Sequence, residues 1–293
     1  MSGRPSNFDL HCHSTASDGV LAPAELVRRA HANGVDVLAL TDHDEVTGLA
    51  EARATAAACA IRLVAGVEVS VTWGGITIHV VGLGVDPAHP ALAAGLDHVR
   101  SSRVRRAERI AAEFDALGIE GTLAGAYSYA ANPNLVGRTH FARFLVERGV
   151  ARDVRSVFHR FLATGKPGYV PHEWAQLADA VGWIRASGGR AIVAHPGRYR
   201  LSRTDLRRFL DDFKAAGGDG IEVVTGSHTP AQYGEFAALA REFGFLASRG
   251  SDFHGPDESE IDLGALPQLP ADLTPVWHDW HRDRQTRAAA CPA

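Results

Sequence analysis

Short apolar runs alternate with amphipathic stretches along the first third of the chain. The apolar runs are rich in Val, Ile and Leu and are short enough to be buried strands. They cover residues 8–10, 35–40, 63–67 and 76–83. A helical pattern separates the first two runs, with Pro23 near its first turn and Gly34 just beyond its end. Residues 45–60 are rich in alanine and predict a second helix.

The same alternation returns in the second half of the chain. Strand-like runs cover residues 191–194, 221–224 and 245–247, and helical patterns cover residues 174–186, 205–216 and 230–243. Thr204 and Thr229 are the expected N-caps of the last two helices, and Gly244 follows the final one. The interleaving of seven candidate strands with helices predicts an α/β fold with a mostly parallel sheet or barrel.

The middle of the chain is helical in pattern and contains no convincing strand. Apolar residues of the first helix fall near one face, and its arginines at 100, 103, 105, 106 and 109 lie largely elsewhere, which predicts a solvent-exposed arginine face. A pair of helices is predicted over 138–147 and 153–163. We therefore expect a barrel whose first part is 1–95, a helical insertion over 96–168 that caps the substrate site, and a second barrel part over 169–293. The last part includes a C-terminal extension, loosely attached after Pro270.

Composition narrows the function classes. The chain has 293 residues, a formal net charge of −4 and 15 histidines. That charge argues against a surface that binds polyanions everywhere, so affinity for phosphate must come from a local site. No apolar run reaches the length of a membrane span, and nothing in the sequence indicates an obligate protein partner. The N-terminus shows no export signal and the three cysteines are odd in number, so we expect a cytoplasmic protein.

Histidines and carboxylates follow the predicted strands closely. They are His11, His13, Asp18, His43, Glu68, His79, His195, Asp252 and His254. His79 lies within a strand and the others lie just beyond one, at the edge where barrel enzymes build their sites. Cys12 alternates with His11 and His13, so its side chain points the other way. Mixed imidazole and carboxylate ligands suit zinc, manganese or iron(II), and the pattern predicts a metal site.

The motifs that carry these residues occur in a specific order: HCHS, SDG, TDH, GVE, IHVVG, AHP and SDFH. In this order they resemble the polymerase and histidinol phosphatase (PHP) family on both sides of the helical insertion. The resemblance implies a distorted (β/α)7 PHP barrel with a helical insertion domain and a phosphoesterase centre of two or three divalent metal ions. Manganese is favoured as the metal, with iron or zinc as alternatives.

The resemblance also implies a ligand set for each ion. The first ion takes His11, His13, Glu68 and Asp252, the second shares Glu68 and adds His79 and His195, and the third takes Asp18, His43 and His254. Many relatives have a histidine where this chain has Asp18. A hydroxide held by His11, His13, Glu68, His79, His195 and Asp252 is expected to attack the phosphorus atom in line.

Further segments resemble one branch of the family, which includes 3′,5′-nucleoside bisphosphate phosphatases and the 5′-to-3′ exoribonuclease RNase AM. These segments are GRTHFAR, GKPGYVP, AHPGRY and GSHTP. Arginine can bind two phosphate oxygens at once and histidine can donate one hydrogen bond. We therefore expect substrate binding by Arg138, His140, Arg198, Tyr199, Ser227, His228 and Lys166, with the Tyr199 ring stacking on a base.

The predicted activity is metal-dependent hydrolysis of the 3′-phosphate of 3′,5′-bisphosphonucleosides such as pAp, together with 5′-to-3′ exonuclease activity on short 5′-phosphorylated RNA. The nearest alternative is histidinol-phosphate phosphatase or another small-molecule phosphomonoesterase. A C–N hydrolase of the amidohydrolase type is disfavoured because only Lys166 and Lys214 could be carboxylated. A non-catalytic PHP module is disfavoured because all nine ligand-type residues are present.

Overall fold

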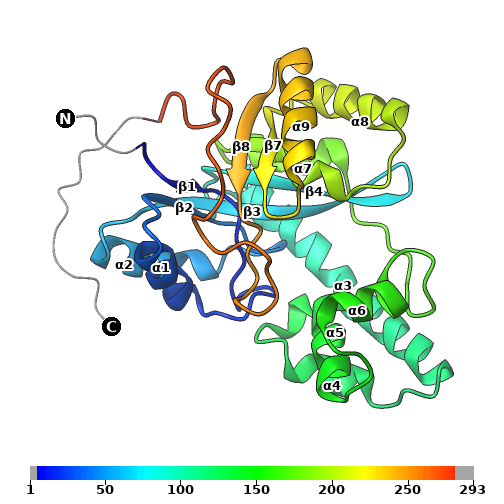
Figure 1. Cartoon of the computed structure of the whole chain (residues 1–293). Helices are drawn as coiled ribbons and strands as arrows, with labels where there is room; N and C mark the ends of the chain where they lie inside the picture. Colours follow the sequence, from blue (N-terminus) through cyan, green and yellow to red (C-terminus); the bar gives the residue numbers. More distant parts are fainter. Residues whose placement is uncertain (1–4, 281–293) are drawn as a thin grey trace.

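The computed structural model describes residues 5–280 and shows an α/β fold built on a nearly closed barrel (Figure 1). The described strands follow the predicted runs, with one short addition, β5. They are β1 (Phe8–Asp9), β2 (Val37–Leu40), β3 (Arg62–Trp73), β4 (Ile76–Leu83), β5 (Ala175–Gln176), β6 (Arg190–Val193), β7 (Gly220–Thr225) and β8 (Leu246–Gly250). The predicted α/β barrel is therefore confirmed.

Neighbouring strands run around the barrel in the order β1-β2-β3-β4-β6-β7-β8, and β5 pairs with β3. Only β4 among these strands runs antiparallel to its neighbours, β3 and β6. The first and last strands meet where Leu10 N donates to Arg249 O at 3.0 Å. Gly250 permits this approach, because a Cβ atom there would lie 2.3 Å from the His11 Cβ. Closure brings the ends of β1 and β8 together at one mouth.

Helices surround the barrel and form the insertion. They are α1 (Pro23–Ala32), α2 (Gly48–Ala58), α3 (Pro90–Ala116), α4 (Thr122–Ser128), α5 (Arg138–Glu147), α6 (Val154–Val157), α7 (Leu177–Ala186), α8 (Arg203–Ala215) and α9 (Pro230–Phe243). Thr229 caps α9 and Gly244 ends it at a φ of 64°, as predicted. The predicted cap of α8 is wrong: Ser202, not Thr204, accepts from the Asp205 N–H, so the helix begins earlier. A π-helical turn over Phe158–Leu162 replaces most of the helix predicted at 153–163.

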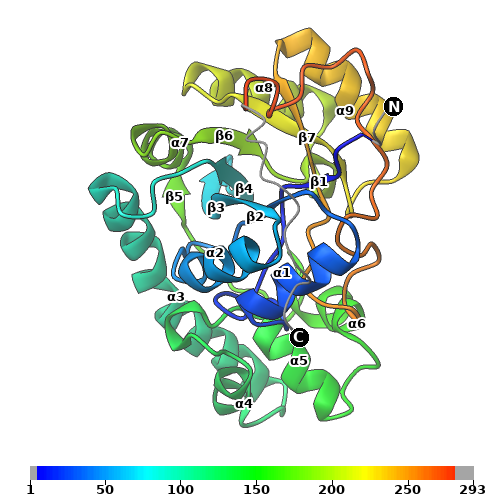
Figure 2. The same cartoon turned by 90° about the vertical axis from the view of Figure 1, so that its left-hand side faces the viewer.

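The segment between β4 and β5 has a hydrophobic core of its own. The first half of α3 packs on the barrel through Leu92, Leu96 and Val99, whereas Ile110 and Phe114 lie in a separate cluster with α4, α5 and α6. Figure 1 shows α4, α5 and α6 gathered on one side of the molecule, away from α7, α8 and α9, and Figure 2 shows the barrel strands enclosed by helices. The domain boundaries at 96 and 168 stay predictions, and α3 runs across the first.

The end of the described chain packs against the barrel, which corrects the prediction of a loose extension after Pro270. Ala247 N donates to Thr274 O and Val276 N donates to Ala247 O, both at 2.9 Å. Val276 is fully buried and the Trp277 ring stacks on Phe8. Residues 281–293, including Cys291, lie outside the described part of the chain. Over residues 5–280, no helix is both long and apolar enough to cross a membrane.

Candidate metal centre and the cavity beside it

All nine ligand-type side chains predicted from the sequence converge at one mouth of the barrel. We call them the histidine wall: His11, His13, Asp18, His43, Glu68, His79, His195, Asp252 and His254. They form four overlapping groups in which the candidate ligand atoms lie within 4.8 Å of one another. The groups draw on both ends of the chain because the barrel closes between β1 and β8. The predicted convergence is thus present in the structure, while the role of each residue as a ligand stays a prediction.

Four of these side chains surround one point. The Nε2 atom of His11 lies 3.4 Å from Glu68 Oε2 and 3.5 Å from Asp252 Oδ1. His13 Nε2 lies 3.3 and 3.4 Å from the same two oxygens. Two ligands each about 2.1 Å from one tetrahedral ion are about 3.4 Å apart, so these separations fit a shared cation. This quartet is the set that the family resemblance implies for the first ion.

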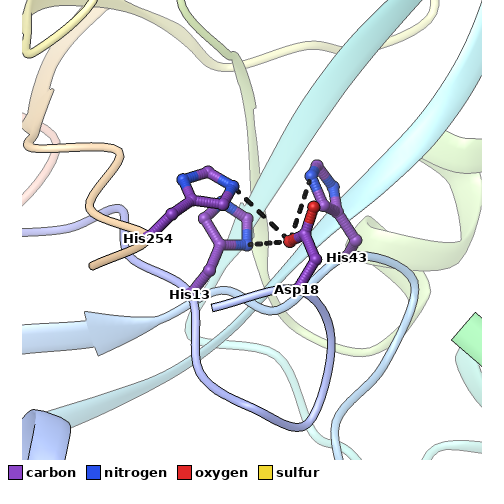
Figure 3. A group of neighbouring side chains, drawn as sticks. All are labelled: His13, Asp18, His43 and His254. Atoms are coloured by element: carbon purple, nitrogen blue, oxygen red, sulfur yellow. Dashed lines mark ion pairs between the residues drawn. The ribbon is translucent and has the colours of Figure 1, made fainter. Parts of the chain in front are cut away.

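The remaining groups share members with that quartet. Glu68 Oε1 lies 3.0 Å from His79 Nδ1 and 2.8 Å from His195 Nε2. Asp18 Oδ1 faces three imidazoles, at 3.5 Å from His254, 3.8 Å from His43 and 4.0 Å from His13 (Figure 3). The third predicted set therefore has His13 as an additional neighbour.

The carboxylates of the histidine wall each have one satisfied and one unsatisfied oxygen. Asp18 Oδ2 accepts from Thr139, Glu68 Oε1 lies against the histidines of β4 and β6, and Asp252 Oδ2 accepts from Arg198 and Ser227. The other oxygen of each is buried without a hydrogen-bond partner. An unsatisfied buried carboxylate oxygen is costly, and three of them facing one cluster of imidazoles fit a set of bound cations. The residues are therefore capable of holding metal ions.

The side chain of Glu222 supports the histidine wall, and several residues at or beside the wall have a strained backbone. Glu222 accepts from His11 Nδ1 at 2.8 Å, which orients the His11 ring, and from the His195 backbone N–H at 2.6 Å, which holds the backbone after β6. Asp44, His195 and Asp252 have positive φ angles of 51°, 26° and 56°. Positive φ costs energy in residues other than glycine and is common at functional sites. Glu222, buried in β7, is a supporting residue that the sequence reading missed.

Electrostatics in the wall favour cations. Burial opposes protonation of His13, but hydrogen bonds to Asp252 and Glu68 outweigh it and raise its pKa to about 10. Burial likewise opposes protonation of His11, yet Glu222, Glu68 and Asp252 raise the pKa of its imidazole well above the ordinary value. Negative potential that holds protons on imidazoles also attracts divalent ions, which displace those protons on binding.

A cavity opens beside the histidine wall, and its lining includes four arginines. We call Arg103, Arg106, Arg138 and Arg198 the arginine wall; all four line this cavity together with Asp18, His43, His79 and His254. Arg103 and Arg106 are only 8% and 6% exposed, so the prediction that they belong to a solvent-exposed face is wrong. Both guanidinium groups lie over the Trp174 ring, at 4.7 and 5.0 Å from its centroid.

Two members of the arginine wall lack a carboxylate partner among the described ion pairs. Arg106 donates only long hydrogen bonds, of 3.4 and 3.5 Å, to Val170 O. Arg138 donates to Leu162 O at 3.2 Å and lies over the Phe158 ring. Burial, with repulsion from neighbouring arginines, lowers the pKa of Arg106 to about 9 and that of Arg138 to about 10. Arg106 is buried and Arg138 is half-buried; both remain cationic at neutral pH, and such a cation without a counterion is suited to an anionic ligand.

Two predicted phosphate-binding histidines do not line this cavity. His140 is 1% exposed and its Nδ1 accepts from the Gly137 N–H, which caps α5. His228 Nδ1 donates to Val223 O and its Nε2 accepts from the Gly197 N–H. Burial lowers the pKa of each to about 4, so both rings are neutral and occupied by backbone groups. Their positions support turns next to the site instead.

The other predicted substrate residues take varied positions. Arg198 lines the cavity and donates to Asp252 at 2.9 Å. The Tyr199 hydroxyl accepts from His79 N and donates to Ala194 O, and its ring is not part of the cavity lining; stacking on a base stays a prediction. Ser227 donates to Asp252 at 3.0 Å and supports it. Lys166 is exposed and lies off the cavity.

The sequence contains a pattern that indicates burial of Arg103 and Arg106. Residues 96, 99, 103, 106, 110 and 114 follow the three-and-four spacing of a single helix face. Val99, Ile110 and Phe114 on this face are buried, so arginines at the two intervening positions must be buried too. Arginine on an apolar face is expensive unless it serves a partner or a ligand.

The barrel and its nine ligand-type side chains place the chain among α/β-barrel proteins that can hold several metal ions. The sequence model of the PHP domain matches residues 9–216, and the chain belongs to this family. A 3′,5′-nucleoside bisphosphate phosphatase from Chromobacterium violaceum is 52% identical over 274 residues, 94% of this chain and 96% of the relative. The 5′-3′ exoribonuclease Rnm of Escherichia coli is 43% identical over 281 residues, 95% of each chain. Both the predicted family and its predicted branch are confirmed.

A solved structure agrees with the fold along almost the whole chain. It is described as an amidohydrolase from Chromobacterium violaceum with bound sulfate and no metal. It is 52% identical to this chain, has a TM-score of 0.90, and the match covers 93% of this chain and 95% of the other.

Proposed function

We propose that this chain is a metal-dependent phosphoesterase that removes the 3′-phosphate from 3′,5′-bisphosphonucleosides and degrades short 5′-phosphorylated RNA from its 5′ end. One observation carries the proposal: a single cavity is lined both by candidate metal ligands and by four arginines. A substrate that spans this cavity needs two anionic groups a few bonds apart. A nucleoside bisphosphate and a 5′-phosphorylated RNA end both meet that requirement.

The histidine wall takes the phosphate that reacts. His11, His13, Glu68 and Asp252 would hold one ion, and the groups around His79 and Asp18 would hold the others. Manganese suits this mixture of imidazoles and carboxylates, with iron or zinc as alternatives. When bound, the ions would lower the pKa of water and neutralise charge on the phosphoryl oxygens.

Arg106 and Arg138 of the arginine wall take the phosphate that does not react. Arg106 and Arg138 have unused N–H groups and no carboxylate partner in the described ion pairs, so a phosphate there gains charge-assisted hydrogen bonds. Arg198 lies between the two walls because it pairs with Asp252 and also lines the cavity. In that position it can hold an oxygen of the reacting phosphoryl group. Trp174 and Phe158 line the same cavity and limit the water that reaches it.

The comparisons support the same substrate class. The two curated relatives are named for nucleoside bisphosphates and for RNA. The sulfate in the solved relative has the shape and charge of a phosphate group. A C–N hydrolase with a carboxylated lysine does not fit, because Lys166 is exposed and Lys214 donates to Phe243 O on the outside of the barrel.

Histidinol-phosphate phosphatase fits less well than a bisphosphatase. The ammonium group of that substrate requires a carboxylate in the cavity. Asp18 is the one carboxylate that lines the cavity, and it belongs to the candidate metal centre. The remaining charged groups of the lining are cationic and would repel an ammonium group.

Phosphate release from purified, manganese-loaded protein tests the proposal. Two substrates that differ by one phosphate, pAp and AMP, are compared at equal concentration. We expect kcat/KM for pAp to be about 10- to 100-fold higher, which corresponds to the strength of hydrogen bonds between charged groups. The protein variant Glu68→Gln, prepared in the same way, controls for contaminating phosphatases. Equal hydrolysis of pAp and AMP would refute the assignment.

A further inference from the structure

Three residues of α5 contact one short turn of the barrel. Thr139 Oγ1 donates to Asp18 Oδ2 at 2.8 Å, and Arg143 Nη2 donates to Asp18 O at 2.6 Å. The His140 ring interacts with the backbone of Ser17. Positions 139, 140 and 143 lie on one side of a helix, so a single face of α5 meets the turn. This helix belongs to the segment between β4 and β5, about 120 residues further along the chain than the turn it holds.

The contact fixes which oxygen of Asp18 faces the metal centre. Thr139 occupies Oδ2, and Oδ1 is left buried without a hydrogen-bond partner, facing His13, His43 and His254 (Figure 3). From the barrel side, Asp42 accepts from Ser14 and Ser17, at 2.7 and 2.6 Å, and holds the other end of the same turn. Asp18 therefore depends on α5 for its orientation, because the described contacts of its carboxylate are with Thr139 and with three candidate metal ligands, His13, His43 and His254.

The same helix also reaches the loop that carries His254. Arg143 Nε and Nη2 bind both oxygens of Glu258, at 2.7 and 2.8 Å, and the Arg143 side chain is 8% exposed. The next residue, Ser259, accepts from the His254 N–H at 2.8 Å. The carboxylate partner of Arg143 therefore lies on the loop after β8 and not on its own helix. Arg143 instead joins the two loops that supply Asp18 and His254.

We propose that Thr139 and Arg143 are positioning residues through which the helical segment between β4 and β5 sets the metal affinity of the group formed by Asp18, His43 and His254. Thr139 turns Asp18 so that its free oxygen faces the imidazoles, and Arg143 holds the two loops together. The proposal rests on the proposed function in so far as this group binds a metal ion. It adds that occupancy of this position depends on the helical segment as well as on the barrel.

Manganese titration of metal-free protein tests the proposal without measuring activity. Free Mn²⁺ is followed by electron paramagnetic resonance, which counts bound ions and gives their affinities. In Thr139→Val we expect one ion to bind about 10- to 100-fold more weakly and the others to bind as in the wild type, because supporting hydrogen bonds change metal affinity by this factor. Thr139→Ser keeps the hydroxyl and should restore the affinity.

A second variant and a control separate positioning from damage to the fold. Glu258→Gln weakens the Arg143 contact and should weaken the same ion by a smaller factor. Ser128→Ala removes a hydroxyl that donates to Gly125 O at the end of α4, away from Asp18, and should change no ion. Unfolding temperatures of the metal-free variants show whether each chain folds.

The outcomes distinguish the two proposals. Weakening of one ion in Thr139→Val with rescue by Thr139→Ser supports the positioning role. Unchanged binding of every ion in a folded Thr139→Val, or equal weakening of all ions, overturns it while leaving the proposed function intact. A wild-type protein that binds none of Mn²⁺, Fe²⁺ and Zn²⁺ overturns both.

Discussion

The two walls of the cavity are built in opposite ways. The histidine wall stands at the ends of barrel strands, and Glu222 and Asp42 hold its rings and turns by short hydrogen bonds. The arginine wall stands largely on the helical segment, through Arg103, Arg106 and Arg138. Arg106 lies over the Trp174 ring, and Arg138 lies over the Phe158 ring and donates to the Leu162 carbonyl. One wall is rigid and rich in acceptors, and the other is cationic with unused donors.

This difference indicates a division of labour. Chemistry at phosphorus needs ligands fixed within a few tenths of an ångström, which a barrel rim provides. Recognition of a second phosphate needs donors and positive charge, and it tolerates side chains that adjust. Changes in the histidine wall should therefore affect turnover of every substrate, whereas changes at Arg106 and Arg138 should affect only substrates with a second phosphate.

The largest effect is expected for Glu68→Gln in the histidine wall. Glu68 is fully buried and lies within 3.4 Å of five histidines: His11, His13, His43, His79 and His195. Loss of its charge should lower kcat by about 1,000-fold for both pAp and p-nitrophenyl phosphate, because metal ions supply several kcal/mol of charge stabilisation. Steady-state kinetics with metal analysis checks this. A loss below tenfold would show that Glu68 is not part of the centre.

A smaller and more selective effect is expected in the arginine wall. Arg106→Gln should raise KM for pAp about 10- to 100-fold and leave KM for p-nitrophenyl phosphate nearly unchanged, because the hydrogen bonds lost are made only to the second phosphate. Arg109→Gln is the matched control, since Arg109 is exposed one turn further along α3. Arg138→Ala should behave like Arg106→Gln. Equal changes for the two substrates would remove these arginines from the proposed pocket.

The pH dependence of metal binding tests the histidine wall alone. His13 has a pKa raised to about 10 in the metal-free chain, so an ion that uses its nitrogen must displace a proton at neutral pH. The pKa of His11 is raised as well, so each imidazole proton that is displaced should lower the apparent Mn²⁺ affinity about tenfold as the pH decreases from 8 to 7. Calorimetry in buffers of different ionisation enthalpy measures the proton released. Binding without proton release would contradict the position of His13 in the centre.

The smallest effect is expected at Tyr199, which supports the histidine wall from behind. Its hydroxyl bonds to His79 N and Ala194 O, each at 2.9 Å. Tyr199→Phe leaves these groups without that partner and should lower the free energy of unfolding by about 1–3 kcal/mol, with KM for pAp unchanged. Denaturant unfolding measures the loss. Full stability in the variant would show that the hydroxyl contributes nothing to the wall.

The histidine wall could be predicted from the sequence because its members follow strand ends. His195 comes two residues after β6 and Asp252 two residues after β8, so recognition of the strands placed both at the rim. The helices flanked by Pro and Gly could also be predicted from the sequence, and α9 is an example. These features depend on local pattern and on the general geometry of parallel barrels.

The helix pattern could have predicted that Arg103 and Arg106 are buried, but the partners of the arginine wall and of the supporting residues are tertiary contacts that no local pattern encodes. Arg103 lies over Trp174, which is 71 positions further along the chain. The sequence predicts that His140 and His228 bind phosphate, but in the structure their ring nitrogens accept hydrogen bonds from the backbone N–H groups of Gly137 and Gly197. Whether a histidine caps a backbone turn or binds a phosphate or metal ion depends on the partner of its ring nitrogen in the folded chain.

Diffraction from crystals of the manganese-loaded chain with bound AMP tests the central claim most directly. The anomalous signal of manganese locates the ions, and the nucleotide shows where a phosphate that does not react is held. The account predicts two or three manganese peaks among the nine side chains of the histidine wall, with the 5′-phosphate within hydrogen-bond distance of Arg106 or Arg138. Manganese outside the wall, or a phosphate bound away from both arginines, would contradict it.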